Sequence, residues 1–211
     1  MKIFIAGASG RVAQELISIL LERGHDIYAG ARSPEKLPSL LGLTAVKLDL
    51  KNGVSDLSQL LLGMDALYFT AGSRGRDLLQ TDAFGAVKLM QAAQKAGVQR
   101  FIMLSSLFAL EPEKWQNQAL ANLQDYYIAK FFADNYLLHQ TDLDYTILQP
   151  GTLLEKPATG KVDFQPEKFA GNAIADVAQV LAGLLDKKAS IGQVIKMIEG
   201  ELAIDQALDT L

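Results

Sequence analysis

Short apolar segments alternate with longer amphipathic segments along most of this chain. Six short segments are typical of strands, and most carry β-branched or aromatic residues on both sides of the pleat. They are residues 2–6, 26–29, 45–48, 66–70, 101–104 and 145–148. A strand that is apolar on both sides fits a parallel sheet covered by helices on both faces. The alternation therefore predicts an α/β fold, built as a doubly wound parallel sheet with right-handed crossovers.

Segments with apolar residues at helical spacing fill the intervals between these strands, and a glycine follows each of the first three. The predicted helices are residues 12–23, 57–61, 77–95 and 123–138. After Pro150 the pattern loosens, and residues 152–168 are typical of an irregular lid. The expected remaining elements are a helix over 174–185, a strand over 193–198 and a short helix over 204–208.

The composition excludes several classes of site. The chain has 211 residues and no cysteine, which rules out disulfides, cysteine-ligated zinc, thiol nucleophiles and iron–sulfur clusters. Its two histidines are far apart in sequence, so no metal site is expected. The net charge is −4 with no basic block, which argues against nucleic acid and against an anionic membrane as partners. No apolar segment is long enough for a signal core or a membrane span, so we expect a cytoplasmic protein.

The turn after the first predicted strand has the glycine spacing of a dinucleotide site. Residues 7–13 read Gly-Ala-Ser-Gly-Arg-Val-Ala. Gly7 permits a tight turn, Gly10 allows close approach of a pyrophosphate, and Ala13 lets helix and strand pack closely. The N-terminus of the following helix presents free N–H groups to phosphate, although a merely structural turn is the alternative. The residues expected to bind the cofactor here are Gly7, Ser9, Gly10, Arg11 and Val12.

The end of the second predicted strand favours NADP over NAD. An NAD site usually has an acidic residue there to bind the ribose 2′-hydroxyl, whereas this chain has Arg32 and Ser33 before Pro34. Arg32 can bind a 2′-phosphate as a bidentate fork, and Ser33 can assist while it caps a helix that begins at Pro34. A surface arginine beside a helix cap is the alternative and leaves NAD possible. Arg74 and Arg76 either face the cofactor phosphates or are exposed loop residues.

With these residues in place, the chain resembles an atypical short-chain dehydrogenase/reductase. The similar group is the compact NAD(P)H-binding, NmrA-like one that includes biliverdin reductase B-type flavin reductases, and the resemblance covers essentially the whole chain. It rests on GASGRVA, GARSPEKL, Asp49-Leu50, Ala71-Gly72, GVQRFIMLSS, Tyr126-x-x-x-Lys130 and DYTILQPG. It implies an NAD(P)-binding Rossmann fold and an oxidoreductase activity.

The resemblance also implies where the cofactor lies. Asp49 and Leu50 would flank the adenine. The positions that would line the rest of the cofactor are Thr70, Ala71 and Gly72, then Ser105, Lys130, Pro150 and Gly151 around the nicotinamide. All of them fall at or just beyond the carboxyl ends of predicted strands, where ligands bind in open α/β sheets.

Three residues are candidates for the chemistry. Tyr126 and Lys130 are four residues apart and share a face of a predicted helix. In the family that the chain resembles, such a lysine binds the nicotinamide ribose, and the tyrosine delivers a proton to a carbonyl oxygen as hydride arrives. Ser105 would donate a hydrogen bond to substrate or nicotinamide. The alternatives are a solvated lysine, a tyrosine that helps to build the buried helix face, and a serine that ends a strand.

Two departures from the family pattern bear on the reaction. The segment around Asp82 lacks the asparagine of many catalytic tetrads, and Gln149 precedes Pro150 where many relatives have arginine. A flavin or quinone acceptor needs less, because stacking on the nicotinamide suffices for direct hydride transfer. The leading hypothesis is an NADPH-dependent oxidoreductase that reduces a small aromatic or carbonyl acceptor, with flavin and quinone favoured. A non-catalytic redox sensor and a nucleotide-sugar epimerase-like enzyme are the alternatives.

The length limits what surrounds the acceptor. We expect one domain over residues 1–211, with a nucleotide-binding core over 1–151 and a lid with C-terminal substrate-side elements over 152–211. The loops expected to form the acceptor pocket are residues 74–77, 107–121 and 152–168. The remainder is too small for an elaborate substrate domain, so we expect an open site for a small-molecule acceptor, in a monomer or a homodimer.

Overall fold

The strands of the computed structural model, which describes residues 1–116 and 122–211, form one mostly parallel sheet. They are β1 (Lys2–Ala6), β2 (Asp26–Ala31), β3 (Leu43–Lys47), β4 (Ala66–Phe69), β5 (Arg100–Leu104), β6 (Asp144–Pro150), β8 (Lys161–Asp163), β10 (Gln193–Glu199) and β11 (Leu202–Ala203). The spatial order is β11-β8-β10-β6-β5-β4-β1-β2-β3. Among the described strands, β8 alone pairs antiparallel with its neighbours, β10 and β11. The prediction of a doubly wound α/β fold is confirmed.

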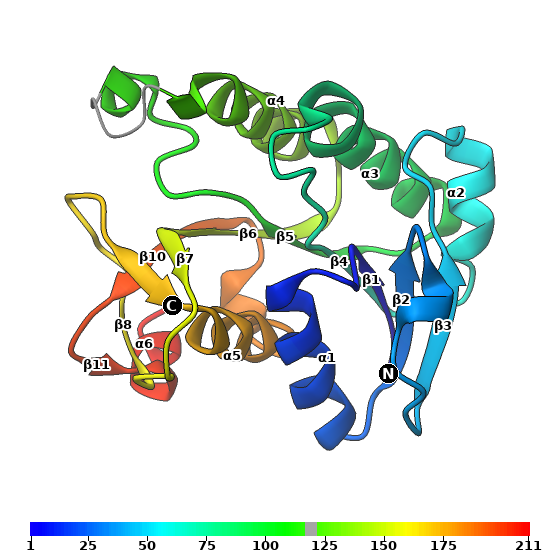
Figure 1. The fold of residues 1–211 in the computed structure, drawn as a ribbon, viewed down its shortest axis with the longest axis horizontal. Helices are drawn as coiled ribbons and strands as arrows, with labels where there is room; N and C mark the ends of the chain where they lie inside the picture. Colours follow the sequence, from blue (N-terminus) through cyan, green and yellow to red (C-terminus); the bar gives the residue numbers. More distant parts are fainter. Residues whose placement is uncertain (117–121) are drawn as a thin grey trace.

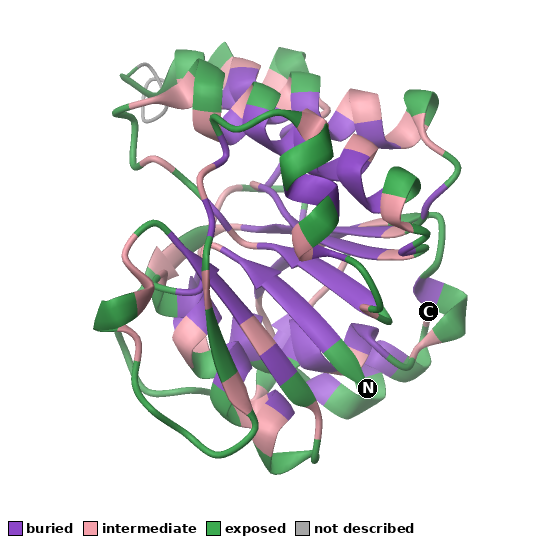
Figure 2. Cartoon of the chain, turned by 90° about the vertical axis from the view of Figure 1, so that its right-hand side faces the viewer, coloured by how far each residue is buried: buried purple, intermediate pink, exposed green. Residues whose placement is uncertain are grey.

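Helices cover both faces of this sheet (Figure 1). One layer holds α1 (Arg11–Glu22), α5 (Ile174–Leu184) and α6 (Ile204–Asp209), and the other holds α2 (Val54–Leu60), α3 (Phe84–Ala96) and α4 (Gln124–Gln140). Alternation along β1 sends Ile3 and Ile5 into the first core and Phe4 into the second. Figure 2 shows the central strands buried between the two layers, as their two-sided apolar sequences require.

The connection between β2 and β3 differs from the prediction. The expected helix from Pro34 is a single 3-10 turn, η1 (Pro34–Lys36), and Ser33 makes no capping hydrogen bond. The reason is Pro38, because a proline disfavours helical geometry in the residue before it, and Leu37 is extended with φ −76° and ψ 149°. The predicted role of Ser33 as a helix cap is therefore wrong.

Two other segments differ in secondary structure from the prediction. The expected helix over 77–95 begins as a π-helix, η2 (Leu78–Ala83), before α3, and Gly97 then ends α3 with φ +78°. The predicted lid contains β7 (Thr152–Leu154), which pairs with β9 (Gly171–Ala173) in a separate two-stranded sheet, and it also contains β8. Short 3-10 turns, η3 (Pro112–Gln116) and η5 (Lys188–Ser190), occur in two further loops.

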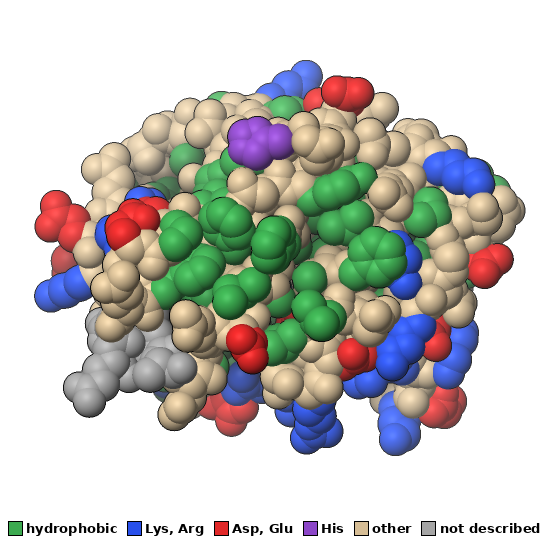
Figure 3. Space-filling view, turned by 90° about the horizontal axis from the view of Figure 1, so that it is seen from above, with side chains coloured by type: hydrophobic (Ala, Val, Ile, Leu, Met, Phe, Trp, Pro, Cys, Tyr) green, Lys and Arg blue, Asp and Glu red, His purple; other side chains and the backbone are tan. Residues whose placement is uncertain are grey.

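The outer face of α3 and α4 carries apolar side chains. Seen from above, they form a patch on the surface (Figure 3), and Phe84 and Phe132 are 52% and 62% exposed. Within the two described ranges, no helix combines the length and apolarity that crossing a membrane requires.

Candidate cofactor and substrate site

Two adjoining pockets lie at the carboxyl ends of the parallel strands. The inner pocket, about 390 Å³, is bordered by the ends of β4, β5 and β6 and by α4. The outer pocket, about 290 Å³, is bordered by the ends of β1, β2 and β3. They share Gly10, Ala71 and Arg74, so they form one groove. The groove crosses the boundary between β1 and β4, where the strand order reverses and where open α/β sheets bind ligands.

The loop between β1 and α1 forms the centre of this groove. Gly7 has φ +89°, and a Cβ there would lie 2.5 Å from the Cα of Ala71. Gly10 caps α1 without any side-chain hydrogen bond, and the first turn of α1 lines the inner pocket. A loop that only glycine backbone can form, followed by an uncapped helix N-terminus, fits the pyrophosphate of a dinucleotide.

Three arginines surround the outer pocket. Arg32 comes from the end of β2, and Arg74 and Arg76 come from the loop after β4, so residues far apart in sequence meet at one site. Arg74 has φ +53°, a left-handed conformation that a non-glycine residue adopts at an energetic cost. Ser9 also lines this pocket, whereas Ser33 does not. The positive charge and hydroxyl fit an anionic group on the ribose.

The opposite wall of the outer pocket is apolar. Leu48 and Leu50, which follow the end of β3, both line it and suit a flat adenine ring. Asp49 lies between them in the sequence and is not part of the lining. Its carboxylate accepts a hydrogen bond of 2.9 Å from the N–H of Lys51. Leu48 was not predicted as a site residue, and the signal that would have found it is its position directly after β3, at the carboxyl edge of the sheet.

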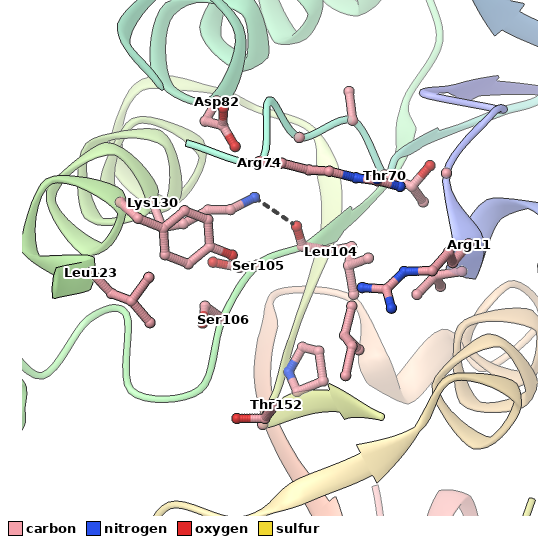
Figure 4. Close-up of a pocket in the computed structure, with 18 of the residues that line it drawn as sticks. Arg11, Thr70, Arg74, Asp82, Leu104, Ser105, Ser106, Leu123, Lys130 and Thr152 are labelled. Atoms are coloured by element: carbon pink, nitrogen blue, oxygen red, sulfur yellow. Dashed lines mark hydrogen bonds between the residues drawn. The ribbon is translucent and has the colours of Figure 1, made fainter. Parts of the chain in front are cut away.

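The inner pocket brings together the three residues predicted for the chemistry. Lys130 is buried on α4, and its Nζ donates to the carbonyl oxygen of Leu104 at 3.2 Å (Figure 4). The same Nζ lies 5.8 Å from the centre of the Tyr126 ring. Ser105, at the end of β5, lines the same wall. Predicted cofactor residues that also line the pocket are Gly10, Arg11, Val12, Thr70, Ala71, Gly72, Pro150 and Gly151.

Behind this wall lies a buried polar cluster that the sequence did not reveal. Asp134 is fully buried on α4, and its Oδ2 accepts hydrogen bonds from Ser105 Oγ at 2.7 Å and Gln149 Nε2 at 2.9 Å. Burial raises the pKa of Asp134 to about 6, although both hydrogen bonds and the charge of Lys130 oppose the rise. The available signal was spacing, because Asp134 follows Lys130 by four residues and so shares its helix face.

A second buried carboxylate faces the pocket from the π-helix. Asp82 is fully buried on η2, and its Oδ2 accepts a hydrogen bond of 3.0 Å from the N–H of Ser73. Its Oδ1 has no hydrogen-bond partner among the described residues. Figure 4 shows Asp82 and Lys130 on the same side of the cavity, across from Thr152. The inner pocket thus has both acidic and basic groups on its walls.

The lid segment contributes the remaining wall. Thr152 and Leu153 of the lid line the inner pocket, together with Phe169 just beyond the lid. Arg11 of the phosphate loop forms an ion pair of 2.8 Å with Glu155 just beyond β7. Of the loops predicted to form the acceptor pocket, residues 117–121 lie outside the described residues.

Comparisons with known proteins agree with this geometry. A sequence profile described as NAD(P)H-binding matches residues 7–188. The chain is 37% identical over 219 residues to YhfK of Bacillus subtilis (strain 168), described as an uncharacterized sugar epimerase, and the match covers all of both chains.

Two solved structures extend the comparison. The oxidoreductase ylbE from Lactococcus lactis has 49% identity and a TM-score of 0.97, over 100% of this chain and 96% of that one. The anaerobillin reductase ChuY from Escherichia coli O157:H7 has 25% identity and a TM-score of 0.82, over 96% of this chain and 98% of that one. The predicted resemblance to NAD(P)-binding Rossmann oxidoreductases is confirmed. From the glycine loop, the groove and these matches, the chain belongs to the NAD(P)H-binding family.

Proposed function

We propose that this protein is an NADPH-dependent oxidoreductase that reduces a small aromatic or carbonyl acceptor, with flavin and quinone favoured. The observation that carries the proposal is the continuous groove, in which an arginine-lined outer pocket joins an inner pocket walled by Lys130, Ser105 and Tyr126. A bound nicotinamide would supply the hydride. Lys130 would hold the nicotinamide ribose, while Ser105 and Tyr126 face the acceptor from β5 and α4.

Preference for NADPH rests on Arg32, Arg74 and Arg76. Their guanidinium groups offer charge-assisted hydrogen bonds to a 2′-phosphate, and β2 ends in Gly30 and Ala31 with no carboxylate to bind a free ribose hydroxyl.

Calorimetric titration tests this preference. We expect NADPH to bind more tightly than NADH, and Arg32→Ala to weaken NADPH binding by about 10-fold or more while NADH affinity stays the same. Lys36→Ala, which removes an exposed charge outside the pocket lining, is the matched control. Equal affinities for the two cofactors in the unmodified protein would contradict the NADPH assignment.

The open inner pocket supports a hydride acceptor that binds mainly by stacking. Its walls include Tyr127, Phe169 and Leu153, which offer apolar surface to a flat ring system. The likeness to ylbE and ChuY, named as an oxidoreductase and a reductase, supports the same class of reaction.

An acceptor panel tests the activity. The unmodified protein should oxidise NADPH when FMN, dichlorophenolindophenol or a quinone is supplied. Tight binding of NADPH without turnover across the panel would instead support a redox sensor.

A second candidate is an epimerase, which the name of YhfK favours. Incubation with UDP-hexoses, followed by NMR of the sugar anomeric protons, separates the two functions, because only an epimerase would return an inverted sugar.

A further inference from the structure

We propose that Asp134 and Ser105 form a proton relay that supplies the inner pocket. The inference rests on the proposed reductase function, because a hydride that reduces a C=O group requires a proton on oxygen. Asp134 lies behind the pocket wall, and Ser105 stands between its carboxyl group and the cavity. The distance from Ser105 Oγ to Asp134 Oδ2 is 2.7 Å, which is short enough for direct proton exchange.

The hydrogen bonds of Asp134 fit a group that holds a proton. Its Oδ2 meets both Ser105 and Gln149, while its Oδ1 is buried with no partner among the described residues. Burying an ionised carboxylate with one oxygen that has no hydrogen-bond partner costs much free energy. Burying the unpaired carbonyl oxygen of a neutral carboxylic acid costs less. The raised pKa of Asp134 agrees with this reading.

The charges around Asp134 are few. On α4 itself Lys130 faces it and favours the ionised form. Its hydrogen-bond partners from the ends of β5 and β6, Ser105 and Gln149, are uncharged. The neighbouring η2 brings Asp82, whose carboxylate is bonded to the N–H of Ser73. Burial among uncharged partners is therefore the main influence on its protonation.

The proton balance of the relay is simple. When Asp134 is protonated, its O–H donates to Ser105, and the hydroxyl of Ser105 is free to donate into the pocket. As hydride adds to the acceptor carbon, the C=O electron pair moves to oxygen. That oxygen takes the Ser105 proton, and Ser105 takes the proton of Asp134. Asp134 is left as a carboxylate, and water entering after product release returns a proton through Ser105.

The substitution Asp134→Asn tests the relay, because the amide keeps the hydrogen bond to Ser105 but passes no proton. With a quinone or carbonyl acceptor we expect kcat to fall by about 100-fold and KM for NADPH to stay unchanged. In the unmodified protein kcat should fall as the pH rises above about 6, where Asp134 loses its proton, and this dependence should vanish in the variant. Asp142→Asn, in an exposed loop, is the matched control.

Two further variants separate the relay from other proton sources. Ser105→Ala should lose as much activity as Asp134→Asn, and the double variant should lose no more than either, because the two residues act in series. Normal activity in Asp134→Asn or in Ser105→Ala, or a larger loss in the double variant than in either single variant, would overturn the relay.

A measurement without turnover decides whether Asp134 holds a proton. Infrared difference spectra between the unmodified protein and Asp134→Asn should show a carboxylic-acid stretching band that titrates near pH 6. Absence of that band overturns the relay whatever the activity. Failure of the unmodified protein to oxidise NADPH with any acceptor would contradict the proposed function, whereas normal turnover in Asp134→Asn would contradict only the relay.

Discussion

Single backbone positions decide whether the cofactor groove exists. Gly7 combines φ +89° with an approach to Ala71 that leaves no room for a Cβ, so two independent constraints require glycine there. Gly63 has a similar φ of +74° but nothing within 4 Å of its missing Cβ, so only the first constraint applies. The spacing of glycines in the sequence predicts the loop, but only the packing against Ala71 distinguishes a glycine that is preferred from one that is required.

This difference predicts unequal effects of two alanine substitutions. Gly63→Ala should lower the free energy of unfolding by about 1 kcal/mol, from backbone strain alone. Gly7→Ala should lower it by about 3 kcal/mol, because the clash with Ala71 adds to the strain, and it should also weaken NADPH binding. Denaturant unfolding and calorimetric titration measure the two effects, and equal losses in both variants would contradict the close approach.

At the scale of elements, the π-helix η2 and the short strand β7 shape the pocket. The π-helical turns of η2 place Asp82 in the pocket wall, and β7 places Glu155 opposite the start of α1. Apolar periodicity predicts a helix over 77–95, but it does not distinguish a π-helical start from an α-helical one, because the apolar residues are too few in six positions. The sequence pattern does not predict β7 in the lid either, because β7 has only three residues and pairs with β9, about 20 residues later.

The ion pair between Arg11 and Glu155 gives a prediction for the lid. Both side chains are exposed, so Glu155→Gln should change the free energy of unfolding by less than about 1 kcal/mol. Removal of the carboxylate frees Arg11 beside the phosphate loop, and NADPH should bind severalfold more tightly at low salt. High salt should abolish this gain. Glu201→Gln, which breaks the exposed pair of Glu201 with Lys161, is the control and should leave NADPH affinity unchanged.

At the scale of the whole molecule, the order of the strands brings the residues of the site together and buries the carboxyl group of Asp134 beneath them. Ser105 directly follows β5, Asp134 lies on α4 and Gln149 lies on β6, and the parallel pairing of β5 with β6 brings the three together. The folded pKa of Asp134 is about 6, above its ordinary 3.8, so the native state binds this proton more tightly than the unfolded chain. The stabilisation that proton binding by Asp134 gives the native state is complete below pH 3.8 and is lost as the pH rises through about 6.

This linkage predicts how Asp134→Asn changes stability. The ionised carboxylate should destabilise the native state by about 3 kcal/mol at pH 8, and the variant lacks that charge. The stability of Asp134→Asn relative to the unmodified protein should therefore increase between pH 5 and pH 8. Denaturant unfolding at both values measures it, with Asp142→Asn as the control. An equal difference between the two proteins at both values would show that Asp134 does not titrate in this range.

The sequence by itself determined the layered fold, the phosphate loop and the charge at the end of β2, because each depends on local periodicity or on residues close together in the chain. The tertiary structure alone decided the convergence of Arg74 and Arg76 with Arg32 and the hydrogen bond of Ser105 to Asp134. These features depend on which strand ends lie side by side and on how tightly the helices pack over them. Contacts between residues far apart in the chain leave no periodic pattern in the sequence. The cluster of Ser105, Asp134 and Gln149 could therefore be identified only from the folded structure.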